Sequence, residues 1–328
     1  MVQASDDPIE TLIPASLRAA LARRELLVRR PVAGVRHGQH RSLRPGLGRD
    51  FRDYRAYVPG DDPRRLDWRA AARSQRLVVR QTESEEELAL VLAIDGSGGM
   101  DYGEGAGDRW RWAGTLAASL ATLALRQGDR VGFALGRAGA IETGMLEPTA
   151  RRDRLRALGR LFVHERPRGT CPWPELLGAI AARLRRQSLI VVLSDLLDPA
   201  GNPDSTDRSA DEALLRDLGL LRAGGHDVVV VQLLHPDELE FPWAEPRVLQ
   251  LEDPRGRRPE IEGPGSALRE GYLGRLDEHL RWLEHACEQV GLLHARVVTQ
   301  GDPTGPLLEL LARLAGVPVE PATREAER

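Results

Sequence analysis

Lysine is absent from this sequence. The chain has 328 residues, and all 46 of its lysine-or-arginine residues are arginine. The absence excludes the lysine of a phosphate-binding P-loop, the lysine of a protein kinase and any Schiff-base lysine. The chain is therefore not itself a P-loop ATPase, a kinase or a Schiff-base enzyme.

Cysteine is scarce, and long apolar runs are missing. The two cysteines, Cys171 and Cys287, lie far apart and match no metal or redox spacing. No run of about 18 apolar residues occurs, so we expect no membrane-spanning helix. The acidic start of the chain lacks the apolar stretch of a signal peptide. Together these features predict a cytoplasmic protein.

Charge is unevenly distributed along a chain of ordinary composition. The chain is 41% hydrophobic and 29% charged, with a formal net charge of −3, as is typical of soluble globular proteins. Residues 15–80, however, hold 17 arginines against 6 acidic residues. Such a segment either binds nucleic acid or packs on an acidic surface, its own or a partner's. We favour packing, because aromatic residues that we interpret as buried anchors interrupt the arginines: Phe51, Tyr54, Tyr57 and Trp68.

Local patterns before residue 88 predict one helix, a turn and a short strand. Leucines spaced along residues 8–30 indicate a helix that Pro31 ends. Residues 59–63 form a strong turn signal, and residues 76–80 indicate a short strand.

Strands and helices alternate after residue 88. Apolar runs such as 88–94 are typical of strands that are buried on both faces of a parallel sheet. Further strands are expected at 131–135, 140–145, 189–193, 228–234 and 295–299, with an edge strand at 247–251. Helices are expected at 108–127, 150–163, 174–186, 209–223, 266–290 and 305–315. This alternation predicts a doubly wound, mostly parallel, Rossmann-like α/β sheet.

The same patterns predict four segments. Residues 1–34 form an N-terminal helical segment, and residues 35–87 form an arginine-rich, strand-containing extension that packs on the main domain. Residues 88–316 form the α/β domain, and residues 317–328 form a flexible tail.

Oxygen-bearing side chains follow two of the predicted buried strands. Asp95 and Ser97 come after the first, and Asp195 comes after a later one, while Thr170 lies in a loop before a helix. Ligands of open parallel sheets bind at the carboxyl ends of strands. Carboxylates and hydroxyls are hard ligands, so this set predicts a site for Mg²⁺ or Mn²⁺. The alternative is that these residues only cap helices and form turns.

This ordered set resembles the metal-ion-dependent adhesion site of von Willebrand factor A domains, over residues 88 to about 315. The resemblance implies that the metal keeps one coordination position for an acidic residue of a partner protein. The chain departs from the motif at Gly99, where the family has a second serine. Water then has to replace that ligand, or the metal is lost.

The N-terminal block sharpens the resemblance. Gly38-Gln-His-Arg-Ser42, Arg55-Ala-Tyr57-Val-Pro-Gly60-Asp61-Asp62 and Arg64-Arg-Leu-Asp67-Trp68 are similar to the signature of the family known as domain of unknown function 58. That family joins such a block to a von Willebrand factor A-like domain and is commonly encoded beside MoxR-type AAA+ ATPases. The resemblance implies an adaptor or co-chaperone that links such an ATPase to its client.

Charged residues of this block are candidates for partner binding. They are Arg55, Asp61, Asp62, Arg64 and Asp67, which either form a structural ion-pair clasp or a docking surface for the ATPase. Trp173 lies close after Thr170, so we expect it on the rim of the metal site, as a further partner contact.

Our main hypothesis from the sequence is a non-enzymatic adaptor. Asp95, Ser97, Thr170 and Asp195, with or without Mg²⁺, would grip an acidic side chain of a partner. One alternative is a Mg²⁺-dependent phosphohydrolase that uses the same carboxylates. The other is a nucleic-acid binder that uses the arginine-rich block.

Overall fold

The computed structural model describes residues 8–28, 45–57, 66–74, 77–83, 88–137, 145–184, 187–197, 208–243, 248–257 and 260–317. The chain divides into two compact units. One consists of residues 1–28 and 88–328, and the other of residues 29–87. Each unit is described by itself below.

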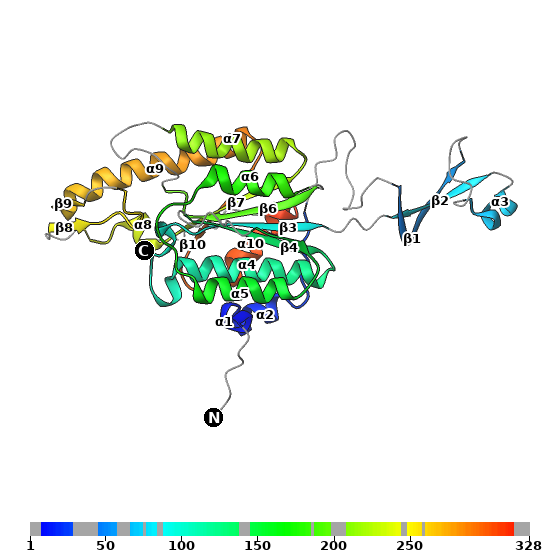
Figure 1. Cartoon of the computed structure of the whole chain (residues 1–328), viewed down its shortest axis with the longest axis horizontal. Coiled ribbons are helices and arrows are strands. Elements are labelled where there is room, and N and C mark those ends of the chain that lie inside the picture. The colour runs from blue at the N-terminus through cyan, green and yellow to red at the C-terminus, as the bar shows by residue number, and fades with distance from the viewer. Residues whose placement is uncertain are drawn as a thin grey trace, which may run out of the picture. The chain divides into compact units, whose positions relative to one another are not determined.

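A sheet of six strands forms the centre of the larger unit, counted over the described residues (Figure 1). Its strands are β3 (Ala89–Asp95), β4 (Arg130–Gly136), β5 (Leu146–Thr149), β6 (Ser188–Ser194), β7 (Asp227–Leu234) and β10 (Leu293–Val298). They lie in the order β10-β7-β6-β3-β4-β5, and all neighbours are parallel except the edge pair β4 and β5. This is the strand order of a doubly wound sheet, so the predicted fold class is confirmed.

Alternate residues of the central strands pack on opposite faces of the sheet. In β3, Leu90, Leu92 and Ile94 join one core, and Val91 and Ala93 join the other. Successive side chains of a strand point to opposite faces, so a strand that is buried on both faces needs a continuous apolar run. The run at 88–94 reflects this double burial.

Helices cover both faces of the sheet (Figure 1). One layer contains α4 (Arg109–Arg126), α5 (Asp153–His164) and α10 (Thr304–Leu314). The other layer contains α6 (Trp173–Arg183), α7 (Ser209–Ala223) and α9 (Gly265–Gln289). Among the described residues, no helix has both the length and the apolar character that a bilayer crossing requires.

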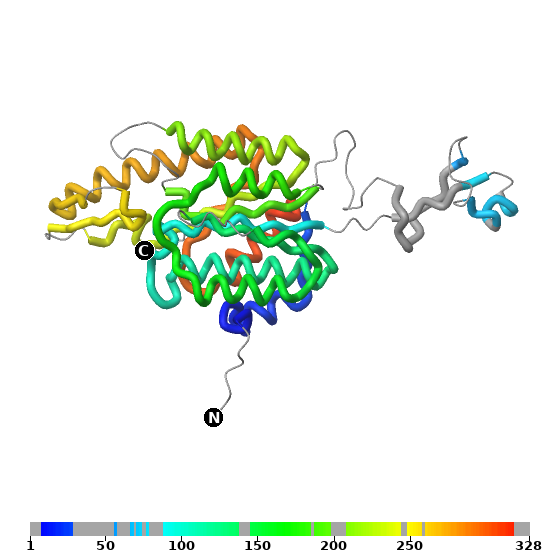
Figure 2. The backbone as a smooth tube through the Cα atoms, viewed as in Figure 1, coloured from blue at the N-terminus to red at the C-terminus, as the bar shows by residue number. Residues whose placement is uncertain are grey.

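Two short helices begin the larger unit, where we expected a single one. They are α1 (Pro8–Leu12) and α2 (Ala15–Leu21). The break falls at Pro14, which has no N–H to donate inside a helix. Leu12, Leu17 and Leu21 pack into the core on the side of α4, α5 and α10, and Figure 2 shows this segment beside α4 and α5. Residues 8–28 therefore belong to the α/β unit.

A two-stranded antiparallel sheet lies apart from the main sheet. It pairs β8 (Val248–Leu251) with β9 (Ile261–Pro264) and leads into α9. The expectation that residues 247–251 form an edge strand of the main sheet is wrong in this respect. A short helix, α8 (Pro236–Glu240), which the sequence patterns did not predict, follows β7. Both elements lie beyond the carboxyl ends of the main strands (Figure 1).

The smaller unit pairs β1 (Pro45–Ala56) with β2 (Val78–Glu83) in antiparallel fashion, and α3 (Trp68–Ser74) lies between them in the chain. The Asp67 carboxylate accepts a hydrogen bond from the Ala70 N–H at the start of α3. Within this unit Trp68, at the start of α3, is 66% exposed, so it is not buried by the unit's own residues, and its predicted role as an anchor on the main sheet stays a prediction. That this unit packs on the α/β domain stays a prediction.

We predict that two leucines on α7 differ sharply in their contribution to stability. Leu218 is 0% exposed and Leu220 is 65% exposed. Leu218→Ala leaves a cavity in the core and should lower the free energy of unfolding by about 2–5 kcal/mol. Leu220→Ala is the matched control and should change it by less than about 0.5 kcal/mol. Denaturant unfolding followed by circular dichroism measures both, and equal losses would contradict this packing.

His294 on β10 should make stability depend on pH. Burial, and then the nearby Arg296, Arg313 and His279, lower its pKa to about 4. In the unfolded chain histidine titrates near pH ~6.5, so the unfolded state binds the proton more tightly. Stability is then complete above pH ~6.5, and we expect a loss on the order of 3 kcal/mol as the pH falls to about 4.

Denaturant unfolding at pH values between about 4 and ~6.5 tests whether His294 causes this pH dependence. His294→Gln should flatten the fall in unfolding free energy. His285→Gln, at an exposed position of α9, should leave it as steep as in the parent. If the free energy of unfolding of His294→Gln falls with pH as steeply as that of the parent, the pH dependence comes from other groups.

Candidate functional site

The predicted site residues lie where the strand order of the main sheet reverses. Asp95 ends β3, and Ser194 ends the neighbouring strand β6, with Asp195 directly after it. The chain winds away from these two strands in opposite directions, to β4 on one side and to β7 on the other. In open α/β sheets the crevice at this point binds ligands.

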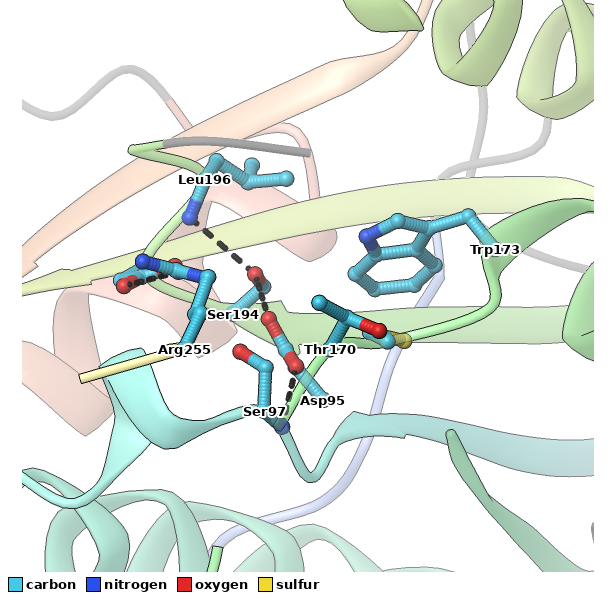
Figure 3. A pocket seen from close by; sticks show the side chains of 9 residues that line it. Asp95, Ser97, Thr170, Trp173, Ser194, Leu196 and Arg255 are labelled. Atoms are coloured by element: carbon cyan, nitrogen blue, oxygen red, sulfur yellow. Dashed lines mark hydrogen bonds and ion pairs between the residues drawn. The ribbon is translucent and has the colours of Figure 1, made fainter. Parts of the chain in front are cut away.

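Backbone hydrogen bonds hold two loops together at this edge. Gly96 donates to the Gly136 carbonyl at 2.8 Å, and Gly98 donates to the Gly169 carbonyl at 2.9 Å. Arg168 donates in return to the Gly96 carbonyl at 2.9 Å. These bonds bring the loop before α6 to the loop after β3. As a result the four predicted ligands, Asp95, Ser97, Thr170 and Asp195, line one cavity, which Figure 3 shows.

Asp95 is buried within a chain of hydrogen bonds (Figure 3). Its Oδ1 accepts from the Ser97 N–H at 2.8 Å, and its Oδ2 accepts from the Ser194 hydroxyl at 2.5 Å. Ser194 Oγ in turn accepts from the Leu196 N–H at 3.1 Å. Burial and the nearby negative charge of Asp195 raise the pKa of Asp95, although both serine hydrogen bonds oppose the rise. Leu196 has a φ of 51°, a conformation that non-glycine residues rarely adopt.

Asp195 is equally buried, but two arginines face it. One terminal nitrogen of Arg255 lies 2.7 Å from Oδ1 and 2.6 Å from Oδ2. Arg109 lies 3.3 Å from Oδ2. Burial raises the pKa of Asp195, but Arg255 and Arg109 outweigh it and hold this pKa below its usual value. Asp195 is thus a carboxylate whose charge the arginines balance.

Arg109 joins three segments beneath the site. It begins α4, is 1% exposed, and donates to the Gly99 carbonyl at 2.5 Å. Its other terminal nitrogen donates to Glu238 on α8, whose carboxylate also accepts from the His235 N–H at 2.8 Å. Burial raises the pKa of Glu238 despite the ion pair with Arg109. Arg109 therefore links the 3₁₀ turn at Gly98–Met100 to Asp195 and to α8.

Arg255 reaches the site from the loop that follows β8. The carboxylate of Asp253 shapes this loop by accepting from the N–H groups of Arg255 and Arg257, both at 2.9 Å. Two glycines permit the approach. A Cβ on Gly98 would overlap the Pro254 carbonyl, and a Cβ on Gly99 would overlap both Arg255 and Asp195. Sequence patterns could not identify Arg255, because no motif spacing connects it with the strand ends.

A divalent metal ion does not fit this donor set as it stands. In favour of a ligand, Ser97 Oγ is buried and has no hydrogen-bond partner among the residues that the structure describes. However, the Arg255 guanidinium already occupies the oxygens of Asp195. The remaining cavity has a volume of about 10 Å³, room for about one water molecule, whereas Mg²⁺ normally keeps several. Across the described ranges, no cluster of three His, Cys, Asp or Glu residues is placed to hold a metal.

The remaining predicted partner contacts have different placements. Trp173 lines the cavity (Figure 3) but is only 4% exposed. It packs in the core on the side of α6, α7 and α9, so its predicted role as a surface contact is wrong. Arg55 lies in β1, and Asp67 caps α3. Asp61, Asp62 and Arg64 lie outside the described residues.

Comparisons with known proteins identify relatives of the chain. The family model described as "Protein of unknown function DUF58" matches residues 53–280. The uncharacterized protein Rv1480 of Mycobacterium tuberculosis is 32% identical over 256 residues, which is 75% of this chain and 71% of that protein. The uncharacterized protein Mb1516 of Mycobacterium bovis matches to the same extent.

Solved structures resemble the chain at lower identity. The conserved hypothetical protein BatB from Bacteroides thetaiotaomicron has 15% identity and a TM-score of 0.41, covering 70% of this chain and 99% of that one. The pilus adhesin SpaC from Lactobacillus rhamnosus GG has 12% identity and a TM-score of 0.42, covering 71% of this chain and 30% of that one.

We predict that Arg109 is essential to the stability of the site. Arg109→Met leaves the buried Asp195 and the partly buried Glu238 without this partner, and should lower the free energy of unfolding by about 3–5 kcal/mol. Arg111→Met, at an exposed position in the first turn of the same helix, should cost less than about 0.5 kcal/mol. Urea unfolding of both variants measures the difference. A loss as small as that of the control would mean that Arg109 does not hold these segments together.

Proposed function

The chain belongs to the family described as Protein of unknown function DUF58, and we propose that it is a non-enzymatic adaptor that binds a partner protein at the carboxyl ends of its central strands. The partner we propose is a MoxR-type AAA+ ATPase, its client, or both. The observation that carries the proposal is the arginine-filled carboxylate site at the switch point of the sheet.

The geometry of the site favours binding over catalysis. The cavity of about 10 Å³ leaves room for about one water molecule and none for a phosphoester. Both carboxylates are already engaged, Asp95 by two serines and Asp195 by two arginines. Burial and the nearby Asp95 raise the pKa of the Cys171 thiol well above its usual value, which makes that thiol a poor nucleophile. The phosphohydrolase alternative therefore has no support in this geometry.

The rim of the cavity offers positive charge to an acidic partner. Arg168 is exposed, and its backbone is bonded to Gly96 beside Asp95. Arg168 therefore borders the loop after β3, two residues before the half-buried Thr170. Charge complementarity of this kind steers encounter and selects partners, so we propose that an acidic side chain of the partner docks against this rim.

The identity of the partner rests on the resemblance of the N-terminal block, and the absence of lysine is consistent with it. A chain with no lysine has no P-loop lysine of its own, so work that requires ATP hydrolysis needs a separate ATPase. An adaptor that links a AAA+ ATPase to a client satisfies that need without catalytic groups.

Affinity capture from the host lysate tests this proposal. The tagged parent chain should recover a MoxR-type AAA+ ATPase that mass spectrometry identifies. Arg168→Glu reverses the charge of the rim and should lower that recovery by about tenfold, equivalent to ~1.4 kcal/mol of binding free energy.

Arg160→Glu is the matched control, because it places the same change on an exposed position of α5. This variant should recover the ATPase as the parent does. If no such ATPase is recovered, the adaptor role fails; if Arg168→Glu recovers it undiminished, the docking rim is wrong.

A further inference from the structure

We infer that Arg255 is a built-in cation that occupies the place of a divalent metal, so that the strand-end site of this chain works without a metal ion. The inference concerns the chemistry of the site alone. It holds or fails independently of which partner the chain binds.

The Arg255 guanidinium lies where a metal ion bound to Asp195 would lie. A single terminal nitrogen of Arg255 stands 2.7 Å and 2.6 Å from the two oxygens of Asp195. A cation placed symmetrically before both oxygens is the arrangement of a metal ion held by a bidentate carboxylate. The side chains of Arg255 and Asp195 are only 8% and 1% exposed, so this is an enclosed pair rather than a surface contact. Charge-assisted hydrogen bonds are strong in such surroundings.

Gly99 gives independent support for Arg255 as the replacement of a metal ion. A serine in this position would add a third hydroxyl to the hard oxygens of Asp95, Ser97 and Thr170. The space that its Cβ would take is filled by the Arg255 guanidinium and by an oxygen of Asp195. Gly99 and Arg255 therefore depend on each other: the guanidinium of Arg255 fills the space that a side chain at position 99 would need.

The charged groups of the cluster that contact one another are paired without a metal. Arg109 and Arg255 supply two positive charges, and Asp195 and Glu238 supply two negative charges that contact them. Asp95 receives hydrogen bonds from Ser97 and Ser194 instead of contacting an arginine. A divalent ion added to this arrangement would face two fixed guanidinium groups, and their repulsion would oppose its binding.

Thermal unfolding with MnCl₂ and with EDTA tests the inference on the full chain. The parent should have the same Tm in both conditions, and so should Arg257→Gln, the matched control from the exposed end of the same loop. Arg255→Gln should have a lower Tm in EDTA, because Asp195 loses a cation. MnCl₂ should then raise the Tm of Arg255→Gln by at least about 2 °C, which is near the shift per kcal/mol for a chain of this size.

A serine at position 99 supplies a second test, which also covers a poorly folded Arg255→Gln. Gly99→Ser alone should lower the Tm, because the new side chain collides with Arg255. In the double variant with Arg255→Gln the serine should cost less, and the response to MnCl₂ should grow. Such non-additivity is the mark of two residues that share one space.

Three outcomes would overturn the inference. One is a parent Tm that rises with MnCl₂ as much as that of Arg255→Gln. Another is a Gly99→Ser cost that is the same with and without Arg255. The third is a folded double variant that does not respond to MnCl₂, since the vacated place would then not be a cation site. None of these measurements requires the ATPase. They therefore test the role of Arg255 even if affinity capture recovers no ATPase.

Discussion

A buried carboxylate needs a nearby cation. Asp195, directly after β6, obtains two cations from other segments of the chain. The cost of leaving Asp195 unpaired in the interior would be several kcal/mol. Arg109 and Arg255 both reach it, from the start of α4 and from the loop after β8. Each ion pair holds the segment that carries its arginine, α4 or the loop after β8, against the site. The pairing therefore decides where these segments lie against the carboxyl edge of the sheet.

The consequences extend to elements that have little apolar packing of their own. The β8–β9 hairpin is a two-stranded sheet with exposed apolar residues such as Val248 and Ile261, and isolated hairpins are marginally stable at best. Its loop is fixed where Pro254 and Arg255 pack against Gly98 and Gly99. The short helix α8 is held in a similar way, through the ion pair of Glu238 with Arg109. Electrostatic anchoring thus adds to the limited apolar packing of this region, where Leu239 of α8 packs against the cluster of Leu234, Leu276 and Leu280.

The parts of the fold that sequence patterns predicted well are those that hydrophobic burial controls. The strands β3 and β6 are built on continuous apolar runs, and β7 is built on an apolar run that Gln232 interrupts. The expected helix at 209–223 is α7 itself, Ser209–Ala223. The strand-end residues Asp95 and Asp195 followed from the same reasoning, since neighbouring parallel strands end at one edge. The helix expected over 8–30 was broken by Pro14, and the strand at 247–251 left the main sheet. Neither error involves burial in the central sheet, and each concerns a short or peripheral element whose place depends on local geometry.

Arginine, as the only strongly basic residue of the chain, gives the site a particular character. A buried lysine shifts its pKa and sheds its charge, whereas arginine stays protonated in proteins. The cation beside Asp195 is therefore permanent, unlike a metal ion, whose occupancy varies with its free concentration. No periodicity links position 255 to position 99, because their contact comes from a loop whose path depends on tertiary structure. What the sequence does display is the missing side chain at Gly99. An absence within an otherwise complete motif is informative, because another group has to fill the vacated space in a close-packed interior.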